Sequence, residues 1–156
     1  MQKIVTYLWF DNQAEQAAEL YTSLFDNSRI VNVTRYGDAG PGPKGTAMIV
    51  AFELAGQEYL ALNGGPQYKF TEAVSLLVNC ENQAEVDRLW GKLTEGGEEQ
   101  PCGWLKDRFG LSWQIIPTAL SRLMGDPDPE KAGRVMQAML QMSKIEIAEL
   151  EKAYAG

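Results

Sequence analysis

The tetrapeptide Asn-Gln-Ala-Glu occurs twice in the chain, at residues 12–15 and again at residues 82–85. In both places it follows a short apolar run and opens a segment in which apolar residues recur every three or four positions, as in an amphipathic helix. The two helix patterns also agree further along, because Leu20-Tyr21 and Leu24 correspond to Leu89-Trp90 and Leu93. Asn and Glu are favoured at helix starts in general, so the longer agreement is what indicates an internal duplication.

Strand-like runs surround both helix patterns. In the first copy residues 29–36, 46–54 and 58–62 are separated by Gly and Pro, and residues 73–80 open the second copy. The closing hairpins also correspond at a constant spacing (110 − 56 = 54; 113 − 59 = 54). We therefore expect an α+β fold in which paired βαβββ modules form one curved mixed sheet, whose uncovered face encloses a cavity.

The chain of 156 residues is expected to be a single domain. Its expected parts are a first module over residues 1–66, a second module over residues 67–120 and a C-terminal helical tail over residues 121–156. The tail begins with a polar turn and continues as a Met-rich amphipathic helix over residues 130–142 and a final helix over residues 146–154.

Composition narrows the possible functions. The 21 acidic and 14 basic residues give a net charge of -7, which disfavours nucleic acid and anionic membranes as partners. The chain has no histidine, so Ser-His-Asp hydrolysis and HExxH zinc sites are excluded in their usual forms. No long apolar stretch indicates a signal peptide or membrane helix, and we expect a cytoplasmic protein.

Two motifs permit a functional and a structural interpretation. Gly40 to Gly45 spells G-x-G-x-x-G, but a β-type run follows it where a nucleotide loop needs a helix, so we expect a hairpin connection. Cys102 could act as a nucleophile with Lys106 as the neighbouring cation, although no histidine can serve as its base. A half-buried cysteine on a strand is the simpler interpretation.

Three segments resemble the PhnB-like family of the glyoxalase/bleomycin-resistance/dioxygenase (vicinal oxygen chelate) superfamily. They are Tyr7 to Asp11, Leu62 to Pro66 and, most specifically, the Asp-x-x-Gly-x-x-Trp-Gln hairpin from Asp107 to Gln114. The resemblance extends over essentially the whole chain, tail included. Members of this family often carry a demethylubiquinone methyltransferase-like label.

The resemblance implies a homodimer with a pocket inside the curved sheet. In the superfamily's enzymes four ligands, one from the first and one from the last strand of each module, hold a divalent metal. Aligned on this pattern, the chain has Thr6, Leu60, Ser75 and Gln114 at those positions, and none of them is a histidine or a carboxylate. We therefore expect no metal and no cofactor.

Period-two alternation gives the expected cavity lining. It directs Tyr7, Trp9, Leu76, Val78, Trp113 and Ile115 towards the helices. The expected ligand-binding residues are Thr6, Leu8, Phe10, Asn63, Ser75, Leu77, Cys102, Trp104, Ser112 and Gln114. Aromatic walls with a few neutral polar groups suit a small organic molecule with an aromatic or quinone-like body.

Three hypotheses of function remain at this point. In the first, the chain is a metal-independent homodimer that binds a small organic molecule. In the second it is an enzyme of the same superfamily, a lyase, isomerase or transferase with a weak or unusual metal site, which includes the methyltransferase label. In the third it is an interaction protein whose Met-rich tail docks on a partner. The residues alone do not identify catalytic groups.

Overall fold

The computed structural model describes residues 2–156. The chain divides between Phe70 and Thr71 into two compact units, each with a four-stranded sheet of its own. The break lies close to the boundary at residue 66 that the sequence suggests, and the second unit also contains the C-terminal tail.

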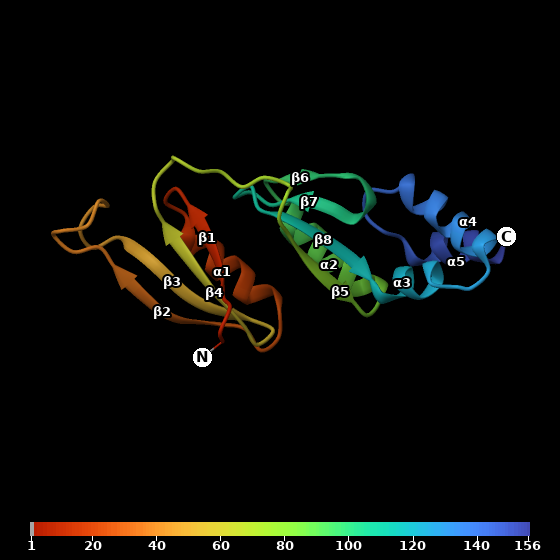
Figure 1. Ribbon diagram of the computed structural model, residues 1–156, viewed down its shortest axis with the longest axis horizontal. Helices are drawn as coiled ribbons and strands as arrows, with labels where there is room; N and C mark the ends of the chain where they lie inside the picture. Colours follow the sequence, from red (N-terminus) through yellow and green to blue (C-terminus); the bar gives the residue numbers. More distant parts are fainter. Residues whose placement is uncertain (1) are drawn as a thin grey trace. The chain divides into compact units, whose positions relative to one another are not determined.

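The first unit is a βαβββ module. It consists of β1 (Thr6–Phe10), α1 (Ala14–Leu24), β2 (Arg29–Arg35), β3 (Ala47–Leu54) and β4 (Gln57–Asn63). The strand order is β1-β4-β3-β2, with β1 parallel to β4 and antiparallel pairing elsewhere. Helix α1 lies against one face of this sheet (Figure 1).

The core of the first unit lies between α1 and the sheet. Leu8, Ala61 and Val50 are neighbours across β1, β4 and β3 and are all buried. Phe52, two residues after Val50, contacts the ring of Tyr21 on α1 at a centroid distance of 6.4 Å. Alternation therefore assigns the even-numbered residues of β1 and β3 and the odd-numbered residues of β4 to the helix side.

The second unit repeats the module in shortened form and adds three helices. It consists of β5 (Ser75–Cys80), α2 (Gln83–Thr94), β6 (Glu98–Glu99), the 3-10 turn η1 (Pro101–Gly103), β7 (Trp104–Lys106) and β8 (Ser112–Pro117). The tail consists of α3 (Thr118–Met124), α4 (Pro129–Leu140) and α5 (Ile147–Ala155). The strand order β5-β8-β7-β6, with β5 parallel to β8, matches that of the first sheet.

The α+β fold built from βαβββ modules is confirmed. The structure refines one detail, since the eight strands within residues 2–156 hydrogen-bond as two four-stranded sheets and not as a continuous one. Helix α3 is the element that the sequence pattern missed, because it follows β8 without a turn residue between Pro117 and Thr118.

The repeated tetrapeptide has different roles in the two modules. Asn82 caps α2, since its side-chain oxygen accepts a hydrogen bond from the Glu85 N–H at 2.9 Å. Helix α1 begins one residue later in its repeat, after Gln13, which makes no side-chain cap. Asn63 from β4 instead accepts the hydrogen bond of the Ala14 N–H at 2.8 Å. Orphan N–H groups at a helix start need an acceptor, and here two different residues provide it.

The hairpin that carries the most specific sequence motif is organised by a buried carboxylate. Asp107 is only 3% exposed. Its Oδ1 accepts hydrogen bonds from the N–H groups of Phe109 and Leu111, and its Oδ2 accepts one from Trp113 Nε1 at 2.9 Å. Because three donors converge on this side chain, the Asp-x-x-Gly-x-x-Trp motif fixes the β7–β8 turn and the Trp113 ring.

Main-chain groups of the tail form hydrogen bonds to the second module. The N–H groups of Cys102 and Gly103 donate to the carbonyls of Met142 and Ser143, both at 2.8 Å. Gln83 at the start of α2 donates to the Ile145 carbonyl at 3.0 Å and accepts from the Ile147 N–H at 2.7 Å. A second apolar core lies beneath these contacts, formed by Ile116, Leu120, Leu123, Val135, Ile145 and Leu150.

The glycine-rich loop of residues 40–45 wraps around one aromatic ring. A Cβ added at Gly40 would lie 2.5 Å from Tyr36 Cδ1, and one added at Gly42 would meet the same ring at Cε2. The loop then leads into strand β3. It is therefore a hairpin connection closed on Tyr36, as the sequence indicates, and no helix follows it.

Among the described residues, no helix combines the length and apolar character needed to cross a membrane.

Replacing Asp107 should destabilise the second unit strongly. In Asp107→Ala two backbone N–H groups and the Trp113 indole N–H lose their acceptor in a buried place, which we expect to lower the free energy of unfolding by roughly 2–4 kcal/mol. Urea unfolding followed by Trp fluorescence measures this change. The exposed Asp38, paired with Lys44, is the control, and Asp38→Ala should change stability by less than about 0.5 kcal/mol. Equal effects of both substitutions would contradict the assigned role of Asp107.

Candidate functional site

The face of the first sheet that α1 leaves uncovered is largely apolar. Val5, just before β1, shares this face with Tyr7 and Trp9, and Leu60 of β4 is the register partner of Tyr7. Tyr7 is 51% exposed and Val31 of β2 is 49% exposed. Large apolar side chains gathered on an uncovered sheet face mark a surface for a ligand or a partner.

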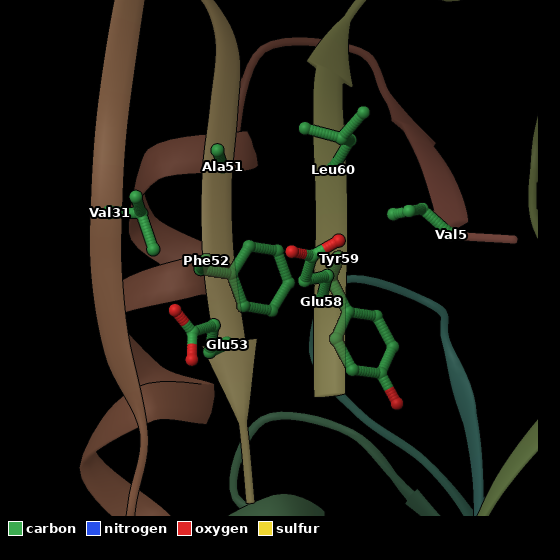
Figure 2. A pocket seen from close by; sticks show the side chains of 8 residues that line it. All are labelled: Val5, Val31, Ala51, Phe52, Glu53, Glu58, Tyr59 and Leu60. Carbon is green, nitrogen blue, oxygen red and sulfur yellow. The ribbon is translucent and has the colours of Figure 1, made fainter. Parts of the chain in front are cut away.

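A pocket with a volume of about 240 Å³ lies on this face. Figure 2 shows the side chains of Val31, Ala51, Leu60 and Val5 following one another across the strands, with Ala51 and Leu60 directly paired in the register. The full lining is Val5, Val31, Ala51, Phe52, Glu53, Glu58, Tyr59 and Leu60. Aliphatic side chains therefore form the floor of the pocket, and polar groups lie towards one end.

That end of the pocket carries two carboxylates. Glu53 and Glu58 are opposite each other in the antiparallel β3–β4 pair, on the same face as Ala51 and Leu60. Glu53 pairs with Arg29 at 3.1 Å. Glu58 Oε2 accepts a hydrogen bond from the Gln2 backbone N–H at 3.0 Å, and among residues 2–156 it forms no ion pair with Lys or Arg.

An aromatic pair lies at the same end of the strands but on the α1 side of the sheet. The rings of Phe52 and Tyr59 are stacked, with centroids 5.3 Å apart and planes inclined by 15°. Burial raises the pKa of the Tyr59 phenol above its ordinary value. The hydroxyl is therefore protonated at neutral pH and adds no negative charge.

The uncovered face of the second sheet has a different chemistry. Leu77, Gln114 and Trp104 form one row across β5, β8 and β7. Gln114 Nε2 donates a hydrogen bond to Ser75 Oγ at 3.0 Å, and Leu77 is 51% exposed. The row thus places an indole, an amide and an exposed alkyl group beside one another.

A second row on this face consists of Ser75, Ser112 and Lys106. Lys106 forms an ion pair with Glu72 at 3.0 Å. Ser112 is fully buried, and its Oγ has no hydrogen-bond partner within the described residues. The Lys106 ammonium, which the sequence hypothesis assigned to Cys102, is thus paired with Glu72.

The expected lining of the second module faces as the sequence indicates. Ser75, Leu77, Trp104, Ser112 and Gln114 share the uncovered face, whereas their alternates Leu76, Val78, Trp113 and Ile115 share the face of α2. That these five residues bind a ligand remains a prediction.

For the first module, the sides of the sheet expected for the lining side chains are wrong. Leu8 and Phe10 are 5% and 4% exposed and belong to the core beneath α1. Thr6 lies in the row of Tyr59 and Phe52, and Asn63 bonds to the start of α1. All four residues are on the helix side of the sheet. Tyr7 and Trp9, expected on the helix side, are on the uncovered face.

A shift of one residue explains this difference. The two first strands end at Phe10 and Cys80, both buried, and are therefore 70 residues apart (80 − 10 = 70). Ser75 then corresponds to Val5 and not to Thr6. Since side chains alternate along a strand, a shift of one position exchanges the two faces. The last strands correspond at 54 residues, so that Leu60 matches Gln114 as the alignment proposes (114 − 60 = 54).

Cys102 lies outside both rows. It belongs to η1, which precedes β7, and its backbone adopts a left-handed conformation with φ 63°. Its N–H bonds to the tail at Met142, and its thiol is free and partly exposed. Cys102 therefore takes part in the attachment of the tail and does not belong to the uncovered sheet face.

Sequence reasoning missed Val5, Val31, Ala51, Glu53 and Glu58 in the first pocket. Alternation along residues 47–54 could have found Ala51 and Glu53, because Val50 and Phe52 are the larger apolar residues and hence the buried ones. Val31 had no such pattern, since the β2–β3 register shifts between Ile30 and Asn32 and a bulge re-aims the side chain.

Comparison with known proteins now adds to this geometry. The family model described as 3-demethylubiquinone-9 3-methyltransferase matches residues 2–116. The PhnB protein of Bacillus cereus is 40% identical to this chain, over 74% of this chain and 99% of its own, with a TM-score of 0.70. The chain belongs to the PhnB-like family.

Two other solved structures share the fold. Protein PA1353 of Pseudomonas aeruginosa is 24% identical, over 75% of this chain and 98% of its own, with a TM-score of 0.62. The genomically encoded fosfomycin resistance protein FosX of Listeria monocytogenes is 15% identical, over 75% and 93% of the two chains, with a TM-score of 0.51. No curated protein matches the chain.

The family match ends before the tail. The model stops at residue 116, one residue before β8 ends, so this match does not extend to the tail as the resemblance was expected to. Helices α3 to α5 lie beyond the matched residues.

The side chains at the superfamily's metal-ligand positions do not fit a divalent cation. In this chain these positions are Val5 and Leu60 in the first unit and Ser75 and Gln114 in the second. The first pair has no donor atom, and the second pair is neutral and hydrogen-bonded to itself. Divalent ions need several oxygen, nitrogen or sulfur ligands, usually with negative charge. Within residues 2–156 no group of three or more His, Cys, Asp or Glu side chains could hold a metal.

The two cysteines should differ in reactivity. Burial raises the pKa of Cys80 to about 12, whereas Cys102 is partly exposed. At pH 8 an aromatic disulfide reagent releases one coloured aromatic thiolate for each cysteine that it modifies. The native protein should release one equivalent of this thiolate per chain rapidly, and the urea-unfolded protein should release two. Cys102→Ser should abolish the rapid phase and Cys80→Ala should preserve it. Rapid release of two equivalents from native protein would contradict the burial of Cys80.

Proposed function

We propose that this PhnB-like chain binds a small organic molecule with an aromatic or quinone-like body on the uncovered faces of its sheets, without a bound metal. The observation that carries the proposal is the apolar pocket on the first sheet. Val5 and Leu60, which occupy the metal-ligand positions of the superfamily, form part of its floor. Alkyl groups in those positions suit an apolar ligand body, because its transfer from water is favourable.

The uncovered face of the second sheet, taken by itself, also has groups that suit a small organic molecule. The Gln114 amide uses one N–H on Ser75 and has a further N–H and an oxygen to offer. Trp104 lies next to Gln114 in the same row. A carbonyl or hydroxyl group bonded to the amide while a ring contacts the indole would match this pair.

The family description favours a second candidate, methyl transfer to an aromatic substrate. Such a reaction needs a site for S-adenosylmethionine, which commonly uses a glycine-rich loop and a helix start. The glycine-rich loop of this chain encloses Tyr36 and leads into β3. We therefore rank binding above methyl transfer.

We also propose that the chain forms a homodimer through its uncovered faces. Tyr7 and Leu77, which do not line the pocket, are each about half exposed on those faces, and a second copy would remove them from water. Light scattering after size-exclusion chromatography should give twice the chain mass of 17.3 kDa. A monomer at micromolar concentration would contradict this part of the proposal.

Filling the pocket should abolish ligand binding. Ala51→Leu adds three carbon atoms between Val31 and Leu60, and binding of the neutral probe 2-naphthylmethanol, measured by titration calorimetry, should weaken at least about tenfold. Ala148 on α5 is exposed, and Ala148→Leu is the matched control. Lack of binding by the unmodified protein, or equal binding by Ala51→Leu, would overturn the proposed site.

Two further measurements separate the candidate functions. S-adenosylmethionine should not raise the Tm of the purified protein, whereas the aromatic probe should. Elemental analysis should find zinc, iron, manganese and nickel well below one equivalent per chain. Stabilisation by S-adenosylmethionine would favour methyl transfer, and a stoichiometric metal would remove the metal-independent proposal.

A further inference from the structure

The acidic end of the first pocket is costly for the sheet itself. Glu53 and Glu58 are directly opposed in the β3–β4 register, and like charges in opposed positions destabilise an antiparallel pair. Arg29 pairs with Glu53 and relieves part of the repulsion. Glu58 gains one neutral donor, the Gln2 N–H. A single Lys at either position would have removed the repulsion, so the fold alone does not explain two acids here.

The two carboxylates are part of a pocket whose other walls are apolar. Val5, Ala51 and Leu60 form the floor, and Glu53 and Glu58 lie towards one end (Figure 2). Next to low-dielectric walls a charge interacts more strongly than in open water.

From this charge complementarity we infer that the ligand of the first pocket is an organic cation, with an apolar or aromatic body on the Val5–Ala51–Leu60 floor and a protonated or quaternary nitrogen at Glu58 and Glu53. The inference rests on the proposed function and specifies the charge of its ligand. Glu58 is the main contact, because Glu53 already pairs with Arg29. An anionic ligand of the same shape would be repelled.

Three probes with one ring system and different charges test the inference. These are 2-naphthylmethylamine, which is cationic at pH 7, neutral 2-naphthylmethanol and anionic 2-naphthoate. Titration calorimetry of the full chain should show the amine binding about tenfold more tightly than the alcohol, and the carboxylate more weakly than both. Raising the salt concentration should reduce the preference for the amine.

Two substitutions of Glu58 separate binding from folding. In Glu58→Gln the preference for the amine should fall below about threefold, while the affinity for the alcohol changes less than twofold. In Glu58→Lys the amine should lose measurable binding, yet the Tm should stay equal or rise because the cross-strand repulsion becomes attraction. Glu19→Gln and Glu19→Lys on α1, which covers the other face, are the matched controls and should keep the preference.

The outcomes distinguish the two levels of the proposal. If the alcohol binds as tightly as the amine and Glu58→Gln changes neither, the pocket binds neutral ligands and the charge inference is overturned. If neither probe binds, or binding persists in Ala51→Leu, the proposed function itself fails. If the Glu19 variants lose the preference as the Glu58 variants do, the effect comes from the overall charge of -7 and the inference is overturned.

Discussion

Each four-stranded sheet of this chain has only one helix of its module to cover it. A sheet buries an apolar face against another layer, and α1 and α2 each provide that layer on one side. The opposite faces then depend on a ligand, on a second chain or on the tail for cover. In the second unit the tail takes part of this role, since Ile116 of the uncovered face belongs to the tail's apolar core. In the first unit no such addition exists among the described residues, and the pocket lies there.

Much of the architecture was accessible from the sequence because it depends on patterns that repeat. The duplicated helix starts, the Gly-separated strand runs and the paired hairpins all gave the βαβββ modules. The side of the sheet on which each side chain of the first strand lies could not be predicted in the same way. Residues 4–10 are apolar or aromatic except Thr6. Thr6 lies on the helix side, so this one polar residue does not mark the uncovered face. The two helix starts are 70 residues apart, and applying this spacing to the first strands would have aligned Ser75 with Val5 and not with Thr6.

The site was only partly predictable for a related reason. At the start of β8 the polar Ser112 and Gln114 alternate with Trp113 and Ile115, and Ser75 and Gln114 were identified. In β3 and β4 the acids Glu53 and Glu58 flank a tight turn, where charged residues are ordinary, so their opposition became visible only in the register. The most specific motif also had a structural role, because Asp107 is committed to three donors within its own hairpin.

The attachment of the tail through Gln83 distinguishes the two repeats. One amide side chain supplies both a donor and an acceptor to the main chain around Glu146, as a neighbouring strand would. The side chains of the held segment contribute separately, since Ile145 is buried in the apolar core and Lys144 pairs with Asp87 at 2.8 Å. Gln13 has the same place in the first repeat but makes no side-chain cap. Identical residues at two helix starts can therefore serve different ends: a plain start in one module and, in the other, the point at which the following chain is attached.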